Sequence, residues 1–232
     1  MRNKFNHRYV WKTVQKAELC EVMHFFSVPR ILRSLVSGCT WEKSGSQKII
    51  YLSFDDGPTP KITSLILELL AQFNAKATFF CVGENLQRYP EMAAQIVLGG
   101  HTLGNHTLRH SKGWNTPVEI YIDEVDQTQG IIDRIQPNAP KLFRPPYGRI
   151  TPKQITEITK RGYEIVLWSE LSCDYDPNVN IQKSIGSLSK NSKSGSIVVF
   201  HDSEKAAAQV LQILPAYLQK MSESGFGFNC LA

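Results

Sequence analysis

Hydrophobic and polar positions alternate in two regular patterns from Lys48 onward. Short apolar runs, typical of buried strands, alternate with stretches whose apolar residues recur every three or four positions, as in helices that cover a sheet. The predicted strands are residues 49–54, 77–82, 102–105, 141–143, 163–168, 196–200 and 226–231. The predicted helices are residues 61–73, 90–98, 118–135, 152–160, 181–188 and 206–221, and residues 170–180 are predicted to form a polar loop.

Repeated strand–helix units predict an α/β fold in which parallel strands are joined by right-handed crossovers. A length of 232 residues suits a single domain of this kind. We expect residues 45–232 to form that domain. Residues 1–44 are predicted to be a basic and amphipathic extension, because they are too few for a second domain.

The extension shows no apolar core of the signal-peptide type in residues 1–19, so we expect no secretory signal in this sequence and a cytoplasmic location. Residues 23–35 carry an apolar stripe, which predicts packing on the domain, with peripheral contact with a membrane as the alternative. Met23 is an alternative start of the protein. No stretch has the ~18 consecutive apolar residues of a membrane span.

The charge and the cysteine content argue against a nucleic-acid-binding protein and against a disulfide-stabilised one. The formal net charge is +5, with lysines and arginines scattered along the chain, which indicates a solvated surface and no nucleic-acid partner. None of the five cysteines forms a C-x-x-C motif, and their number is odd. We interpret them as reduced thiols, with no disulfide framework and no zinc knuckle.

Polar clusters follow the predicted strands where the strands end. In parallel α/β folds the carboxyl ends of the strands share one face, where active sites are built. We therefore expect these clusters to converge on one face. They are Asp55 with Asp56, His106 with His110, Arg144 with Tyr147, Asp174, and His201.

His106 and His110 are four residues apart, a spacing that lets both imidazoles reach one metal ion. One nearby carboxylate would complete three protein ligands and leave positions open for water and substrate, as in catalytic sites. Taken alone, the two histidines are more often a pair of surface residues. His101 is predicted to be a structural histidine beside its strand.

Asp55 and Asp56 follow a strand directly, and neighbouring side chains on an extended segment point to opposite sides. One aspartate can then bind the metal while the other faces a reacting water, although the motif alone is also typical of a turn. Two prolines stiffen the turn after Arg144, so its guanidinium can pair with a carboxylate base. The backbone N–H of Tyr147 can stabilise an oxyanion.

His201 ends the strand of residues 196–200. Alternation places Ile197 and Val199 on the same face as His201. They are predicted to form an apolar floor that receives a methyl group of the substrate. A single histidine at a strand end is often structural, so the case for His201 depends on the other clusters.

In this order, the clusters resemble the motifs of polysaccharide deacetylases, the NodB-homology or family-four carbohydrate esterases. The matching segments are SFDDGP at 53–58, HTLRHS at 106–111, RPPYG at 144–148, DY at 174–175 and IVVFHD at 197–202. The resemblance extends from about Lys48 to the end of the chain. It implies a distorted (β/α) barrel of about seven strands.

The resemblance also implies a divalent metal ion, expected to be zinc, with cobalt, nickel and manganese as alternatives. Asp56, His106 and His110 would be its ligands. Asp55 would be the general base and His201 the general acid in the removal of N-acetyl groups from a glycan built of N-acetylglucosamine or N-acetylmuramic acid. Arg144 would orient the base.

An aspartate of the fourth motif orients the acid histidine in the family, which makes Asp174 the candidate, with Asp176 as the nearby alternative. This chain departs from the family here: the place of a first aspartate is taken by Leu171 and that of a tryptophan by Tyr175. The departure concerns substrate contacts and the tuning of His201 more than the reaction.

Two alternatives remain open at this point. The same groups could remove an O-acetyl or a formyl group, or the protein could be a carbohydrate-binding relative without activity. The second alternative is disfavoured because such a protein should have lost Asp55, a metal ligand or His201, and all are present. We expect an N-acetylated oligosaccharide or polysaccharide as the partner and a monomeric protein.

Overall fold

Strand β1 (Ile49–Asp55) lies at the centre of a parallel sheet, between β2 (Thr78–Cys81) and β7 (Ile197–His201). The structure is a computed structural model that describes residues 26–28, 33 and 37–232. The sheet has the order β5-β4-β3-β2-β1-β7-β6, and every pairing in it is parallel. The remaining strands are β3 (Thr102–Asn105), β4 (Leu142–Phe143), β5 (Glu164–Ile165), β6 (Glu170–Leu171) and β8 (Gly227–Asn229), which pairs with β1.

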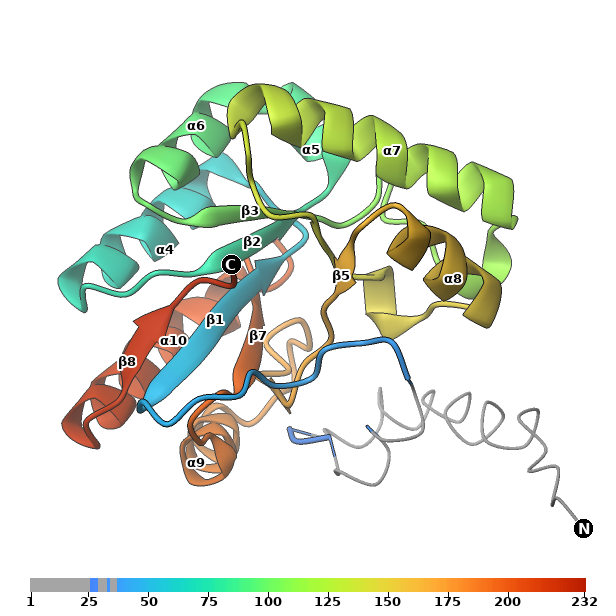
Figure 1. The fold of residues 1–232 in the computed structure, drawn as a ribbon. Coiled ribbons are helices and arrows are strands. Elements are labelled where there is room, and N and C mark those ends of the chain that lie inside the picture. Colours follow the sequence, from blue (N-terminus) through green and yellow to red (C-terminus); the bar gives the residue numbers. More distant parts are fainter. Residues whose placement is uncertain (1–25, 29–32, 34–36) are drawn as a thin grey trace, which may run out of the picture.

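Helices surround the curled sheet (Figure 1). An arc of four helices covers one side: α4 (Pro60–Gln72), α5 (Gly83–Arg88), α6 (Pro90–Leu98) and α7 (Val118–Ile135). The others are α8 (Pro152–Lys160), α9 (Ile181–Asn191) and α10 (Ala207–Glu223), with short 3-10 turns η1 (Gly113–Asn115) and η2 (Pro146–Gly148). The predicted α/β architecture of about seven strands in a distorted barrel is confirmed.

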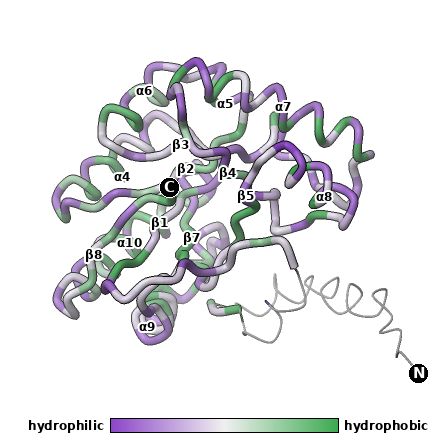
Figure 2. Tube along the Cα trace, in the orientation of Figure 1, coloured by the Kyte–Doolittle hydropathy of each residue, from purple (hydrophilic) through white to green (hydrophobic). Residues whose placement is uncertain are grey.

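Apolar side chains gather between the sheet and its helices. In Figure 2 hydrophobic positions run along the central strands and alternate with hydrophilic ones on the surrounding helices. Phe54 of β1 stacks on Phe79 of β2 and on Phe200 of β7, with ring centroids 4.9 and 5.8 Å apart. These rings are register partners on one face of the sheet, and their burial stabilises the central strands at whose ends the site is built.

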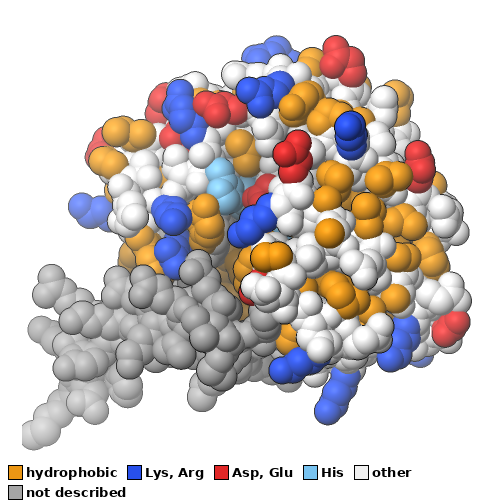
Figure 3. Space-filling view, turned by 180° about the vertical axis from the view of Figure 1, so that it is seen from behind, with side chains coloured by type: hydrophobic (Ala, Val, Ile, Leu, Met, Phe, Trp, Pro, Cys, Tyr) orange, Lys and Arg blue, Asp and Glu red, His pale blue; other side chains and the backbone are white. Residues whose placement is uncertain are grey.

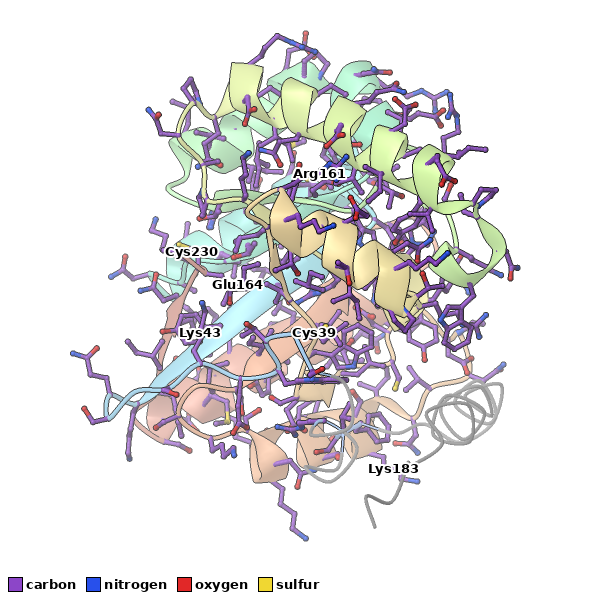
Figure 4. The ribbon with its side chains drawn as sticks, turned by 45° about the vertical axis from the view of Figure 1, so that its right-hand side comes forward. Cys39, Lys43, Arg161, Glu164, Lys183 and Cys230 are labelled. Atoms are coloured by element: carbon purple, nitrogen blue, oxygen red, sulfur yellow. The ribbon has the colours of Figure 1, made fainter. Side chains whose placement is uncertain are left out.

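Residues 26–28 and 37–43 border the two ends of the sheet. The N–H of Thr40 donates to the Ile165 carbonyl of β5, and Ser27 forms an antiparallel bridge with Glu170 of β6. The Lys43 ammonium lies 2.9 Å from a carboxylate oxygen of Glu164, and Figure 4 shows these two residues on neighbouring segments. The described part of the extension therefore packs on the domain, while the predicted boundary at residues 44/45 stays a prediction.

Most predicted elements are present with small shifts of their ends, and three differ. The strand predicted at residues 163–168 pairs with β4 only over Glu164–Ile165. Beyond it, the carbonyls of Val166 and Leu167 accept hydrogen bonds from the Arg144 guanidinium, and the Leu167 N–H donates to Thr40. The predicted loop at 170–180 begins with β6, and the short helix α5 was missed because six residues show no periodicity.

Predictions about the beginning of the chain fall largely outside the described residues. The segments at 1–19 and 23–35 are covered only at residues 26–28 and 33, so their predicted roles stay predictions. Within the described residues, Cys39, Cys81 and Cys230 are free thiols. In the same part of the chain, no helix is both long and apolar enough to cross a membrane.

Candidate active site

The carboxyl ends of five strands meet at one edge of the sheet. Asp55 and His201 end β1 and β7 and are direct partners in the register of these two strands. Parallel neighbours lie about 4.8 Å apart with side chains on the same face, so the two groups face the same space. His106 and Arg144 follow β3 and β4, whose last residues, Asn105 and Phe143, are paired. The structure thus brings together clusters that are far apart in the sequence.

Asp56, His106 and His110 form a compact set of possible metal ligands. One ligand atom from each residue lies within 4.8 Å of the other two. The Asp56 Oδ1 atom is 3.7 Å from Nε2 of His106 and 3.1 Å from Nε2 of His110. Ligand atoms around a tetrahedral zinc ion lie about 3.3 Å apart, given metal–ligand bonds of about 2.0 to 2.1 Å. The donor set therefore suits a divalent ion.

His106 is held in the form that a metal ligand requires. Its Nδ1–H donates to the Arg144 carbonyl at 2.7 Å, which leaves the lone pair of Nε2 directed at the site. Burial lowers the pKa of His106 to about 4, against the opposing charges of Asp55 and Asp56. The imidazole is therefore neutral at neutral pH, and neutral imidazole is the form that binds metals.

Two buried carboxylates that the sequence did not single out hold the ligand loops. Asp202 accepts hydrogen bonds from the Gly57 N–H at 2.9 Å and from the Thr63 hydroxyl at 2.7 Å. A Cβ at Gly57 would collide with the Asp202 carboxylate, so the turn after Asp56 needs glycine. Asp202 is the last residue of the matched fifth motif, and this position in the sequence could have indicated that it belongs to the site.

Glu124 of α7 has the same function for the loop between the two histidines. Its carboxylate accepts from the Ser111 hydroxyl at 2.8 Å and from the Arg109 N–H at 3.2 Å. Thr107 and His110 have φ angles of 63° and 58°, a left-handed conformation that is costly for residues other than glycine. The hydrogen bonds from α7 hold this conformation, and nothing in the sequence connects Glu124 with the loop.

Asp56 reaches the ligand cluster because of its own backbone conformation. Its φ angle is 81°, so the chain leaves the extended conformation of β1 at this residue. The Asn85 amide donates to the Asp56 carbonyl at 2.7 Å and holds the turn. Asp55 and Asp56 therefore point in different directions because of a turn, rather than the strand alternation assumed from the sequence.

Asp55 is paired with Arg144 inside the barrel. The Nη1 atom of Arg144 donates to Asp55 Oδ1 at 2.7 Å and to the Ser53 hydroxyl at 2.8 Å. The guanidinium is fully buried and lies 4.0 Å from the ring centroid of Phe80. Burial lowers the pKa of Arg144, and the Asp55 charge opposes this shift. The hydrogen bond from the buried guanidinium fixes the position of the Asp55 carboxylate, as a general base requires.

His201, the neighbour of Asp55 in the sheet, is paired with Asp174. Asp174 is fully buried and accepts from both the backbone N–H of His201, at 2.8 Å, and its Nδ1–H, at 2.7 Å. Burial alone would lower the pKa of His201, but the charge and hydrogen bond of Asp174 outweigh it and raise the pKa to about 9. His201 is therefore protonated at neutral pH and can donate a proton from Nε2.

This raised pKa predicts an alkaline limit to activity. If His201 acts as the acid, the rate should fall as pH rises through about 9, where the ring loses its proton. In Asp174→Asn the main raising influence is gone, so the limit should move to lower pH. The measurement is the pH profile of kcat for both proteins. An identical alkaline limb in wild type and Asp174→Asn would contradict the assignment.

The remaining predicted residues are placed as follows. Tyr147 is half exposed, and its ring lies 4.7 Å from the His110 ring, so it is at the rim of the site. Val199 and Ile197 are buried inside the barrel, Ile197 packing in a cluster with Phe80. Their contact with substrate, like the oxyanion role of the Tyr147 N–H, stays a prediction. His101 accepts a hydrogen bond from the Ala77 N–H, away from the cluster.

The site opens to the surface in a hollow. Figure 3 shows a histidine side chain in this hollow, next to an acidic side chain and with lysine and arginine side chains around it. Among the histidines in the described residues, the two with appreciable exposure are His110, at 27%, and His201, at 14%. A substrate can thus reach both His110, a candidate metal ligand, and His201, the candidate acid, from solvent.

Two histidines with a carboxylate, together with a paired base and a paired acid, are the arrangement of a metal-dependent hydrolase. The chain belongs to the polysaccharide deacetylase family, whose model matches residues 42–166. It is 35% identical over 190 residues to a peptidoglycan-N-acetylglucosamine deacetylase of Bacillus cereus, with 82% of this chain and 89% of the relative covered.

Two further similarities extend this result. A chitooligosaccharide deacetylase of Azorhizobium caulinodans is 32% identical over 158 residues, covering 68% of this chain and 75% of the relative. The crystal structure of a peptidoglycan N-acetylglucosamine deacetylase superposes with a TM-score of 0.80 at 29% identity, covering 88% of this chain and 95% of that one. The predicted family is confirmed.

Proposed function

We propose that this protein removes N-acetyl groups from N-acetylglucosamine units of a peptidoglycan or chitin-like glycan and releases acetate. The observation that carries the proposal is the set of groups at one end of the sheet: the Asp56, His106 and His110 cluster, the Asp55–Arg144 pair and the His201–Asp174 pair. Amide hydrolysis needs a base for water on one side of the carbonyl and an acid for the leaving amine on the other. The relatives named above act on such glycans.

A divalent ion at the cluster would supply Lewis-acid polarisation of the acetyl carbonyl and activation of water. Asp55, oriented by Arg144, takes the proton of the attacking water. The Tyr147 N–H is the proposed donor to the oxyanion that develops on the carbonyl. His201 gives its Nε2 proton to the leaving nitrogen, while Asp174 holds the ring by Nδ1. Zinc is the proposed ion, because two imidazoles and one carboxylate suit it.

Removal of the metal tests the proposal directly. We expect the purified protein with zinc to release acetate and free amines from N-acetylglucosamine oligomers or peptidoglycan. Chelation should lower the rate by about 10³-fold, because a metal supplies several kcal/mol of transition-state stabilisation. Added zinc should restore it, with cobalt, nickel and manganese compared in parallel.

The outcomes of this experiment separate the alternatives. Acetate without new amines would show that O-acetyl groups are the substrate, and formate would show deformylation. Zinc-loaded protein that binds the glycans without releasing any acid would show a carbohydrate-binding protein and refute the proposal.

A further inference from the structure

Two tyrosines stand on either side of the histidines of the site. The Tyr147 ring lies 4.7 Å from the ring of His110, and the Tyr175 ring lies 5.3 Å from the ring of His201. They come from η2 and from the loop after β6, so they flank the metal cluster from different parts of the chain. A sugar chain that places one acetamido group between base and acid must pass both rings.

A positively charged side chain lies next to each tyrosine ring. The Lys112 ammonium lies 4.8 Å from the ring centroid of Tyr147, and the Lys205 ammonium lies 5.7 Å from that of Tyr175. The Arg149 guanidinium lies 5.2 Å from the Trp114 ring and 5.9 Å from the Tyr147 ring. We call Lys112, Arg149 and Lys205 the rim cations. An aromatic face holds a cation in place without neutralising it.

The rim cations differ from other basic residues on the surface. Lys43, Lys160 and Lys193, for example, each lie within 3.0 Å of a carboxylate oxygen. No ion pair between the rim cations and an acidic residue is found in the described part of the chain, and all three are exposed or half-exposed. The acids of the site are meanwhile engaged within it: Asp55 with Arg144, and Asp174 with His201. The rim cations are therefore available for a charge contact with the substrate.

We propose that the rim cations form a subsite for carboxylates on the glycan, next to the sugar that loses its acetyl group. The inference rests on the proposed function, and it states which glycan the site prefers: an acidic one, over a neutral oligomer of N-acetylglucosamine. Lys112 and Arg149 form the part of the subsite on the His110 side, and Lys205 forms the part on the His201 side. Carboxylates of two kinds suit this chemistry, a lactyl ether on the neighbouring sugar or the end of a peptide attached to it.

The test compares three glycans of equal length: a neutral N-acetylglucosamine oligomer, a peptide-free glycan with free lactyl carboxylates, and one whose lactyl groups carry peptides. The zinc-loaded protein is assayed for kcat/KM on each. Dissociation constants are measured in Asp55→Asn, so that binding is known whether or not turnover occurs. The protein variants are Lys112→Gln, Arg149→Gln, Lys205→Gln and the triple variant.

Lys141→Gln is the matched control. The Lys141 ammonium lies 5.7 Å from the Tyr163 ring, the same distance as Lys205 from Tyr175. Lys141 precedes β4, at the edge of the sheet opposite the site. Its replacement removes the same charge and the same contact with an aromatic ring, so both kinds of glycan should be processed as by the wild type.

We expect the ratio of kcat/KM for acidic over neutral glycan to fall about twofold for each rim variant and about tenfold for the triple variant, given the strength of exposed charge pairs. The wild-type preference should shrink as salt rises from about 10 mM to about 1 M, where the screening length drops from about 30 Å to about 3 Å. Preference for the free lactyl glycan or for the peptide-bearing one identifies the source of the carboxylate.

The outcomes keep the two proposals distinct. Deacetylation of all three glycans with equal kcat/KM, unaffected by the triple variant, would overturn the carboxylate subsite and leave the proposed function intact. Acidic glycans that bind Asp55→Asn more tightly, with no acetate released by the wild type, would support the subsite and refute the function. Equal dissociation constants for neutral and acidic glycans would overturn the subsite in either case.

Discussion

Asp55→Asn should lower the rate of acetate release by about 10³-fold, within the range for loss of a general base, while zinc affinity stays close to that of the wild type. Asparagine has the same shape and can still accept a hydrogen bond from Arg144, but its amide takes no proton from water. Asp55 is not one of the three candidate ligands, because the turn at Asp56 directs the Asp56 side chain, and not that of Asp55, to the cluster. The measurements are kcat on an N-acetylglucosamine oligomer and zinc affinity by competition with a chelator.

Asp56→Asn is the matched control for this result. The two aspartates are neighbours in the sequence, yet only Asp56 belongs to the candidate ligand set. Asp56→Asn should therefore weaken zinc binding as well as activity, and high zinc concentrations should restore part of the activity. If Asp55→Asn instead loses zinc, or keeps most of its activity at saturating zinc, Asp55 is not the base.

Arg144→Met should destabilise the protein by about 3 to 5 kcal/mol, the usual cost of leaving one charge of a buried ion pair without its partner. For a protein of this size that corresponds to a fall in Tm of roughly 10 °C. The guanidinium donates to Asp55, to Ser53 and to the carbonyls of Val166 and Leu167, so its loss also releases the segment after β5. Thermal and urea unfolding measure the effect.

A double variant distinguishes lost pairing from lost packing. In Asp55→Asn/Arg144→Met the carboxylate that Arg144→Met leaves uncompensated is gone, so the double variant should be more stable than Arg144→Met. Ser53→Ala removes an uncharged acceptor of the guanidinium and should lower the free energy of unfolding by about 1 kcal/mol. If the stability lost in the double variant equals the sum of the stabilities lost in the two single variants, the two side chains are not energetically coupled.

The elements were largely predictable because their local patterns are strong. The helix at Val118–Ile135 and the strand at Thr102–Asn105 have the predicted bounds, since apolar periodicity and flanking turn residues define both ends. The strand after Tyr163 was predicted too long. Its apolar residues are buried as expected, but their carbonyls bind the Arg144 side chain instead of a neighbouring strand.

The residues that carry the chemistry of the site could be predicted from the sequence, but the contacts that hold them in place could not. Asp56, His106 and His110 were identified as possible ligands, and the structure brings them within reach of one ion. Asp202 and Glu124 were missed as supports of the ligand loops. Their partners are Gly57 and Thr63 in one case and Ser111 in the other, and only folding makes them neighbours.

The sequence by itself determined the class of fold, the family and the residue types of the site, because each depends on order and spacing along the chain. The tertiary structure alone decided that Asp174 rather than Asp176 holds His201, and that Asp202 and Glu124 support the ligand loops. It also revealed the rim cations, which come from segments far apart in the sequence. Hydrophobic periodicity reports burial, whereas hydrogen bonds and charge contacts of single side chains depend on register and on left-handed turns such as those at Asp56 and His110.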